Sequence, residues 1–208
     1  MSRRILLLLL CLCLPSAAFA AAPHVILVMG DSLSAGYGLE PGQDWPTLLQ
    51  AKLKAEGYDY TVVNASVSGE TSGGGLTRFP QAFANAKPSI VILELGANDG
   101  LRGLPVNEMQ ANLGKMLSLS QQGGAHALLV TMVMPPNYGK TYVQGFADSY
   151  PALAKQYKVP LAPFLLEGIA ERRELLQPDG LHPIAAAEPQ VLANIWPSLK
   201  SLLHKPGK

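Results

Sequence analysis

Residues 24–36 read HVILVMGDSLSAG, an apolar run that stops abruptly at Gly30, Asp31 and Ser32. An apolar run without alternation predicts a strand buried on both faces, as in a parallel sheet covered by helices. Gly30 then permits a sharp turn, which would put Ser32 at the carboxyl edge of the sheet, where open α/β proteins bind their ligands. From this stretch alone, Ser32 is either a nucleophile or part of a helix cap.

Strands and helices are expected to alternate along the rest of the chain. Further strands are predicted at residues 60–64, 89–95, 126–133 and near 159–161, and helices at residues 44–57, 105–123, 143–157, 165–176 and 188–203. Pro197 should bend the last helix, unless that helix ends earlier. This alternation predicts the α/β class, as one three-layer α/β/α sandwich around a parallel sheet.

The first 20 residues have the pattern of a secretory signal peptide. Two arginines precede an apolar run at residues 5–14, and residues 15–20 (PSAAFA) end in small residues. The run is shorter than the roughly 20 residues that span a bilayer. We therefore expect cleavage after Ala20, a single domain at residues 21–208, export to the periplasm or the medium, and no membrane span in the mature protein. An uncleaved anchor is the alternative.

Composition excludes several classes of function. Cys11 and Cys13 are the only cysteines, and both precede the expected cleavage site, so the mature protein would have no disulfide, thiol nucleophile or cysteine-ligated metal. With a net charge of +1 and 15% charged residues, the chain has no basic stripe for nucleic acid. The glycine-rich stretch 65–75, expected to be a loop, lacks the Gly-Lys-Ser/Thr ending of a phosphate-binding loop. The mixed charges at 171–174 (ERRE) are expected on a solvated helix face.

A second polar cluster, PDGLHP at residues 178–183, lies near the end of the chain. A carboxylate at Asp179 can reach back to Nδ1 of His182 and fix the tautomer that leaves Nε2 free to accept a proton. The alternative is a turn with an incidental histidine. The histidines at 24, 126 and 204 are expected to be structural or on the surface.

Acyl transfer needs a nucleophile, a base, an orienting group and hydrogen-bond donors for the oxyanion. Ser32, His182 and Asp179 can supply the first three. The donors could be the backbone N–H groups of Ser32 and Gly69 and the carboxamide of Asn98, which all follow predicted strands and would share one edge of a parallel sheet. Gly69 could instead serve only a turn, and Asn98 an Asx-turn.

Four blocks carry a resemblance to a known family. Gly30-Asp31-Ser32-Leu33, Gly69, Gly96-x-Asn98-Asp99 and Asp179-x-x-His182 resemble, in order and spacing, the blocks of the SGNH (GDSL) hydrolases. More narrowly, residues 30–36 with Trp45-Pro46, residues 69–74 and Asn137-Tyr138-Gly139 resemble its bacterial exported thioesterase I/lysophospholipase/arylesterase group.

The resemblance implies a flavodoxin-like sheet of five parallel strands and a serine esterase or thioesterase without cofactor or metal. It implies that Ser32 is the nucleophile, His182 the base and Asp179 the orienting acid. It also implies Ser32, Gly69 and Asn98 as oxyanion donors. The absence of a G-x-S-x-G elbow argues against the α/β-hydrolase fold.

Two expected loops could form the wall of an acyl-binding groove. Leu104 and Pro105 lie in one, and Pro136, Asn137 and Tyr138 lie in the other. A small acyl ester or thioester is the expected partner, aryl esters and lysophospholipids included, and we expect a monomer. Two alternatives remain: an enzyme that deacetylates or acylates envelope glycans with the same triad, and a non-catalytic envelope binding protein.

Overall fold

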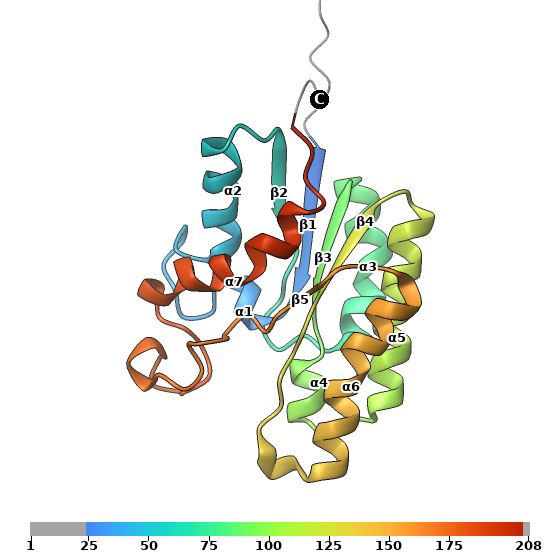
Figure 1. Ribbon diagram of the computed structural model, residues 1–208, viewed down its shortest axis with the longest axis vertical. Coiled ribbons are helices and arrows are strands. Elements are labelled where there is room, and N and C mark those ends of the chain that lie inside the picture. The colour runs from blue at the N-terminus through green and yellow to red at the C-terminus, as the bar shows by residue number, and fades with distance from the viewer. Residues whose placement is uncertain (1–23, 206–208) are drawn as a thin grey trace, which may run out of the picture.

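The computed structural model describes residues 24–205 (Figure 1). The expected signal peptide and both cysteines lie outside these residues. The strands are β1 (His24–Gly30), β2 (Tyr60–Asn64), β3 (Ile90–Glu94), β4 (His126–Val130) and β5 (Leu161–Ala162). The helices are α1 (Ser32–Ala35), α2 (Trp45–Ala55), α3 (Ser72–Ala86), α4 (Ala97–Leu101), α5 (Val106–Gln122), α6 (Lys140–Tyr157) and α7 (Glu188–Lys200), with 3₁₀ turns η1 (Pro136–Tyr138), η2 (Arg173–Leu175) and η3 (Ala185–Ala187).

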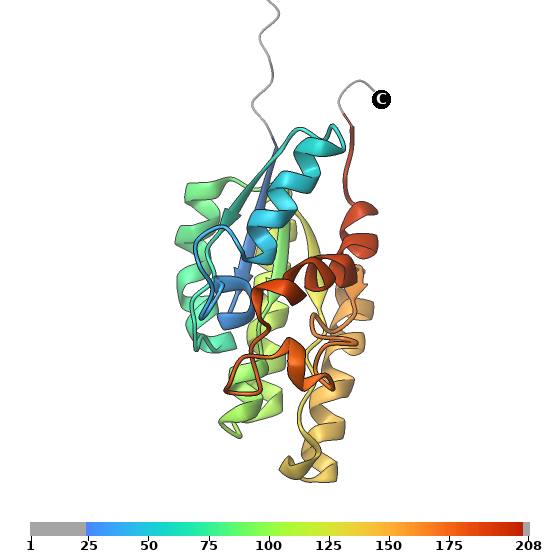
Figure 2. The ribbon, with the colours of Figure 1, turned by 90° about the vertical axis from the view of Figure 1, so that its left-hand side faces the viewer.

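The five strands form one parallel sheet in the order β2-β1-β3-β4-β5. Helices α2 and α7 pack together on one face, and α3, α5 and α6 cover the other (Figures 1 and 2). The predicted three-layer α/β/α sandwich with five parallel strands is confirmed. In a parallel sheet all strands end at the same edge, so the segments that follow them lie close together.

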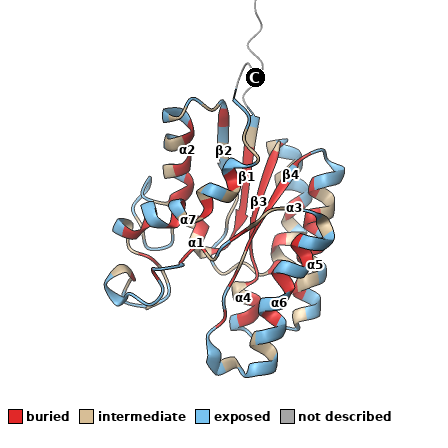
Figure 3. Cartoon of the chain, in the orientation of Figure 1, coloured by how far each residue is buried: buried red, intermediate tan, exposed pale blue. Residues whose placement is uncertain are grey.

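The centre of the sheet is buried on both faces, as its sequence predicts. In β1 the residues from Ile26 to Met29 are completely buried, and every residue of β3 is buried (Figure 3). Glu94 is the exception in this apolar surface, because a carboxyl group ends β3 with no exposure to solvent. This group lies next to the first functional turn, since Glu94 pairs with Gly30 across β1 and β3.

Several expected boundaries are shifted. The fourth strand ends at Val130 instead of Val133, α6 begins at Lys140 instead of Val143, and α7 ends at Lys200 instead of Leu203. Pro197 lies inside α7, so the helix continues past it for less than one turn. Proline fits poorly inside a helix because it has no backbone N–H to donate. The end of α7 at Lys200, shortly after Pro197, agrees with this.

Two segments contradict the sequence prediction. The glycine-rich stretch is not a loop to its end, because α3 begins at Ser72 with Thr71 as N-cap. The glycines of this helix made it look like a loop in the sequence. They allow close packing, because a Cβ on Gly75 would lie 2.5 Å from Leu95 Cδ1. Residues 165–176 form successive turns instead of a helix, with Gly168 at a φ of 70° that right-handed helices do not contain.

Candidate active site

Ser32, His182 and Asp179 lie in a line at the carboxyl edge of the sheet. Nε2 of His182 is 2.7 Å from Oγ of Ser32, and Nδ1 of the same ring is 2.7 Å from Oδ2 of Asp179. The serine is the first residue of α1, directly after β1, whereas the other two belong to the loop before α7. The arrangement has the nucleophile–base–acid connectivity of a serine hydrolase triad.

The loop that holds His182 is fixed by its own carboxylate. Oδ1 of Asp179 accepts the backbone N–H groups of Leu181 at 2.9 Å and of His182 at 3.1 Å, while Oδ2 faces the imidazole. The Leu181 N–H, followed by the imidazole contact, lowers the pKa of Asp179 from 3.8 to about 2. Asp179 is therefore ionised at neutral pH and favours the tautomer with hydrogen on Nδ1.

Two side chains that no sequence motif singles out hold this loop in place. Nε2 of Gln177 donates to the carbonyls of Tyr37, at 2.8 Å, and Pro183, at 2.9 Å, and so joins the segment after α1 to the histidine loop. Arg173 donates to the carbonyls of Gln177 and Pro178, at 2.6 Å for the latter. Residues 171–174 are exposed to solvent as expected, but they lie in a turn and in η2 instead of on a helix face, and the Arg173 guanidinium also braces the loop.

Tyr37 also contacts the candidate base directly. Its ring centroid is 4.5 Å from that of His182, with the planes tilted by 40°. This ring covers one side of the imidazole and limits the positions that His182 can adopt.

Asp31 joins the nucleophile turn to the next strand's turn. It is 1% exposed, its Oδ1 accepts Leu33 N–H at 3.0 Å, and its Oδ2 accepts Nδ2 of Asn98 at 3.0 Å. Burial raises the pKa of Asp31 from 3.8 to about 6, against the lowering effect of the Leu33 N–H. The carboxylate orients the Asn98 amide, whose nitrogen carries a second N–H.

Three N–H groups near Ser32 are left without an internal acceptor. Within residues 24–205, no acceptor is found for the backbone N–H of Ser32, for that of Gly69 or for the second N–H of Asn98. Gly69 has a φ of 78° and is the third residue of a turn closed by Glu70 N–H to Val67 O at 3.1 Å, a position that favours glycine. Unused donors of this kind suit an oxyanion.

The chain is similar to known proteins over most of its length. The GDSL-like Lipase/Acylhydrolase family model matches residues 28–188. The chain belongs to this family. Esterase TesA of Pseudomonas aeruginosa is 49% identical over 96% of this chain and 100% of its own length. The crystal structure of TesA, 49% identical, has a TM-score of 0.84 and covers 86% of this chain and 100% of that one.

Two further relatives have names that describe ester hydrolysis. An arylesterase of Vibrio mimicus is 46% identical over 90% of this chain and 93% of its own length. Thioesterase 1/protease 1/lysophospholipase L1 of Escherichia coli strain K12 is 41% identical over 89% of this chain and 88% of its own length. This GDSL-like acylhydrolase is accordingly a carboxylic ester hydrolase.

Asp99 has a different part in this GDSL-like hydrolase from that of its neighbour Asn98. Its two oxygens accept the backbone N–H of Ser72 at 2.7 Å and the hydroxyl of Ser72 at 2.6 Å, and Nδ2 of Asn112 donates to that hydroxyl at 3.1 Å. A carboxylate at a helix N-terminus stabilises the helix. Asp99 therefore holds α3 against α4, behind the turn that contains Gly69.

The two loops expected to bind the acyl chain meet each other. The hydroxyl of Tyr138 in η1 donates to the carbonyl of Leu101 at 3.0 Å, and that of Tyr142 donates to the carbonyl of Leu104 at 2.7 Å. Pro136 and Asn137 belong to the same 3₁₀ turn as Tyr138, and Pro105 is the N-cap residue of α5. Leu104 and Leu101 are exposed apolar side chains.

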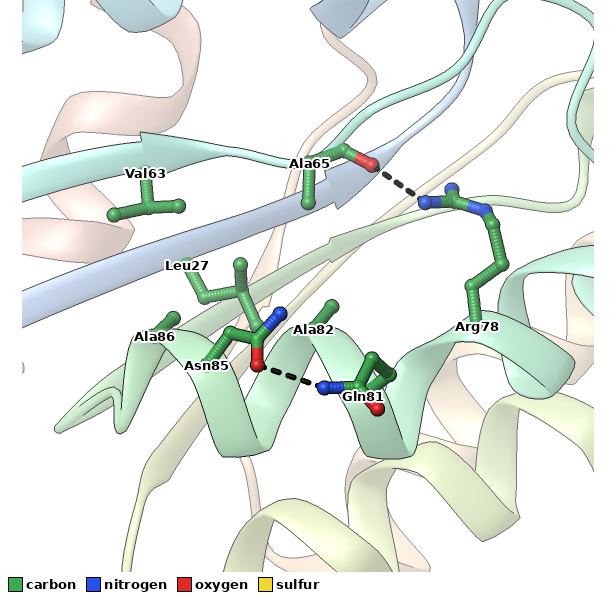
Figure 4. Close-up of a pocket in the computed structure, with 8 residues that line it drawn as sticks. All are labelled: Leu27, Val63, Ala65, Arg78, Gln81, Ala82, Asn85 and Ala86. Carbon is green, nitrogen blue, oxygen red and sulfur yellow. Dashed lines mark hydrogen bonds between the residues drawn. The ribbon is translucent and has the colours of Figure 1, made fainter.

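A separate hollow lies between β2 and α3 (Figure 4). It measures about 510 Å³, and no residue of the triad lines it. Arg78 at its end donates to Oε2 of Glu70 at 2.6 Å and to the carbonyl of Ala65 at 3.1 Å, which ties down the segment before Gly69. The lining residues are Leu27, Val63, Ala65, Arg78, Gln81, Ala82, Asn85 and Ala86.

In the part of the chain that the structure describes, no three His, Cys, Asp or Glu side chains are grouped so as to hold a metal ion. No helix between residues 24 and 205 is both long and apolar enough to cross a membrane.

Proposed function

We propose that this ester hydrolase acts through an acyl-enzyme on Ser32, with His182 as general base and Asp179 as the acid that orients it. The observation that carries the proposal is the pair of 2.7 Å contacts at the two nitrogens of His182. The contact to Ser32 joins side chains 150 residues apart in the chain. An incidental histidine in a turn would not face a serine hydroxyl on one side and a carboxylate on the other.

In the first half-reaction, Oγ of Ser32 forms a bond to the carbonyl carbon as its proton passes to Nε2 of His182. The carbonyl electron pair moves to oxygen, and that oxyanion accepts hydrogen bonds from the N–H groups of Ser32 and Gly69 and from Asn98. The tetrahedral intermediate then collapses. The bond to the alcohol or thiol breaks, and His182 returns the proton to this leaving group.

In the second half-reaction, water gives a proton to His182 and attacks the acyl carbon. Collapse breaks the bond to Oγ, releases the carboxylic acid and restores the Ser32 hydroxyl. The ionised Asp179 stabilises the imidazolium in both half-reactions. The chain's own residues thus supply every proton transfer.

Fatty-acyl esters and thioesters are the proposed substrates, with aryl esters and lysophospholipids among them. The names of the relatives support these classes, and the exposed Leu101 and Leu104 beside η1 would contact the acyl chain. Leu104, Pro105, Pro136, Asn137 and Tyr138 are the proposed acyl-binding residues. A small-molecule substrate, a monomer and no cofactor complete the proposal.

A fluorophosphonate probe tests the nucleophile. The mature protein should be labelled stoichiometrically, and Ser32→Ala should abolish both labelling and turnover while the melting temperature stays that of the wild type. Full activity in Ser32→Ala would exclude this nucleophile. Comparing p-nitrophenyl and acyl-CoA esters of increasing chain length with acetylated sugars then defines the substrate, and a preference for acetylated sugars would favour a glycan esterase.

Export is proposed from the sequence pattern of residues 1–20, with residues 21–208 as the catalytic domain. N-terminal sequencing of the protein recovered from the periplasm or the medium tests this. A mature N-terminus within two residues of Ala21 is expected, whereas an intact N-terminus at Met1 would contradict it.

A further inference from the structure

Glu94 is a buried carboxyl group directly beneath the nucleophile turn. It ends β3, pairs with Gly30 across the sheet, and is completely buried. Its Oε2 accepts the backbone N–H of Asp31 at 3.2 Å and lies 2.5 Å from Oγ of Ser34. These two partners flank Ser32 in the chain, so that one carboxyl oxygen holds the residues on both sides of the nucleophile.

The glycine of the GDS sequence makes this contact possible. A Cβ on Gly30 would lie 2.3 Å from Oε2 of Glu94 and 2.7 Å from Oγ of Ser34, closer than nonbonded atoms approach. Gly30 is not among the residues with positive φ, so its backbone conformation does not require glycine. The space that it leaves for the Glu94 carboxyl is the reason for a glycine here.

The surroundings of Glu94 are those of a neutral acid. Across residues 24–205, no lysine, arginine or histidine forms an ion pair with it, and its Oε1 has no hydrogen-bond partner. The charged group that faces it is Asp31, and the nearby hydroxyl of Tyr150 donates to the carbonyl of Leu95 at 3.0 Å. Burial raises the pKa of Glu94 well above its usual range, and the negative charge of Asp31 raises it further.

An ionised carboxylate without a cation and with one oxygen unbonded is costly in a protein interior, whereas a neutral acid tolerates one unpaired oxygen. If Glu94 carries a proton, Asp31 is the only one of these two carboxyl groups that is negatively charged. The Asp31 carboxylate then accepts the hydrogen bond that orients Asn98. Negative charge on both groups would oppose the charge that develops on the oxyanion, because Asp31 immediately precedes one of its donors.

We propose that Glu94 is a positioning residue that holds the nucleophile turn as a neutral carboxylic acid. The inference rests on the proposed role of Ser32. It predicts that an uncharged isostere can replace Glu94, and that an apolar residue of similar length cannot.

The test compares Glu94→Gln with Glu94→Met. The carbonyl oxygen of glutamine can take the place of Oε2 and accept both the Asp31 N–H and the Ser34 hydroxyl without carrying a charge, whereas methionine fills the space without these hydrogen bonds. The rate of acylation by a fluorophosphonate is measured for each variant. Glu188→Gln is the matched control, because Glu188 is also buried and accepts a backbone N–H, but that of Trp45 in α2 instead of one in the Ser32 turn.

We expect Glu94→Gln to acylate within threefold of the wild type, Glu94→Met to be at least tenfold slower, and Glu188→Gln to match the wild type. The proposal is overturned if the rate of Glu94→Gln is nearer to that of Glu94→Met than to the wild type, because ionisation would then be required. It is also overturned if folded Glu94→Met acylates at the wild-type rate.

A spectroscopic measurement decides the protonation state even if Glu94→Met does not fold. At pH 8.5 the infrared spectrum of the wild type should contain a C=O stretch of a protonated carboxyl that is absent from Glu94→Gln; Asp31 and Glu188, with pKa values of about 6 and about 7, are ionised there. Identical spectra would overturn the proposal. Absence of fluorophosphonate labelling in the wild type would instead refute the role of Ser32. The infrared result would still decide whether Glu94 carries a proton.

Discussion

In the proposed mechanism, Asp31 acts through its hydrogen bond to Asn98 and not through the substrate. Its carboxylate accepts one N–H of the Asn98 amide and thereby fixes the orientation of the amide, leaving the other N–H for the proposed oxyanion. The NH2 group of an asparagine in place of Asp31 would face one of two other donors, either the Asn98 amide or the Leu33 N–H, and one of the two hydrogen bonds would be lost. The orientation of the donor therefore depends on a buried negative charge.

Asp31→Asn should lower kcat/KM by about 10²–10³, the usual effect of losing one oxyanion donor. Because both residues act through one hydrogen bond, Asn98→Ala should cause a similar loss, and the double variant should lose little more than either alone. Hydrolysis of p-nitrophenyl butyrate by the four proteins measures the coupling. Losses that add independently would show that Asp31 does not work through Asn98.

The acidity of Asp31 also predicts a pH effect. Its pKa is raised from 3.8 to about 6, so the folded protein binds this proton more tightly than the unfolded chain, and the stability gained from it is lost as the pH rises through about 6. Activity should change in the opposite direction, because protonation below pH 6 removes the carboxylate that orients Asn98. Asp31→Asn should therefore lose less of its remaining activity than the wild type between pH 7 and pH 5, as measured by kcat/KM.

At this scale the sequence pointed to the candidate residues with reactive groups but not to the residues that hold them in place. Ser32, His182 and Asp179 stand in short motifs whose chemistry can be read directly. Glu94 lies within an apolar run, and its importance depends on being opposite Gly30 in the neighbouring strand. Gln177 has no distinguishing sequence context, because its partners Tyr37 and Pro183 meet only in the folded chain.

Among the elements, the Ser32 and His182 segments are joined by few polar contacts besides the candidate triad. The Gln177 amide supplies one of them, to the carbonyl of Tyr37, and also holds the carbonyl of Pro183 within the histidine loop. A glutamate there would place a carboxylate against two carbonyl oxygens, and two hydrogen bonds of about 1 kcal/mol each would be lost. The relative position of the α1 turn and the histidine loop would then be less well fixed.

Gln177→Glu should lower kcat at least tenfold with a smaller change in KM, because the variant disturbs the Ser32–His182 distance more than the acyl-binding loops. Steady-state kinetics on one ester of medium chain length measures both constants. Gln81→Glu, an exposed substitution on α3, is the control and should resemble the wild type. Equal kinetics for Gln177→Glu and the control would show that the Gln177 contacts do not matter for positioning.

Elements with regular patterns were predictable, and those that depend on tertiary contacts were not. β1 and β3 are continuous apolar runs, and α2 begins with an Asp44 cap and Pro46 as the sequence indicates. The helix α3 escaped prediction because three glycines and Pro80 lie within it, and its start depends on Asp99 from another segment. Residues 165–176 look helical by their apolar spacing, but Asn194 of α7 binds the carbonyls of Leu165 and Glu167 and holds them in turns.

For the whole molecule, one topological fact accounts for the convergence of distant residues. All five strands are parallel, so the turns after β1, β2 and β3 bring Ser32, Gly69 and Asn98 to one edge. The alternation of strands and helices was sufficient to predict this. The strand order was expected only through the resemblance to a flavodoxin-like sheet, because it leaves no periodic signal of its own. The position of the His182 loop over the β1 turn required the structure.

Glu188 connects the helices on the second face of the sheet. It begins α7, is 1% exposed, and its Oε2 accepts the backbone N–H of Trp45 at the start of α2 at 2.7 Å. Burial raises its pKa from 4.5 to about 7, with a smaller contribution from the charge of Asp44. The protonated form is therefore favoured in the folded protein relative to the unfolded chain.

The sign of the linkage follows from this raised pKa. The contribution to the free energy of unfolding is fully present below pH 4.5 and is lost as the pH rises through about 7, by up to about 3 kcal/mol for a shift of this size. Glu188→Gln retains an acceptor for Trp45 but cannot ionise, so its stability relative to the wild type should increase between pH 5 and pH 8. Urea unfolding at both pH values measures the difference, with Glu171→Gln, at an exposed position, as control. A difference between Glu188→Gln and wild type that is the same at both pH values would show that this carboxyl group is ionised throughout, and that the contact between α2 and α7 holds a buried charge instead of a proton.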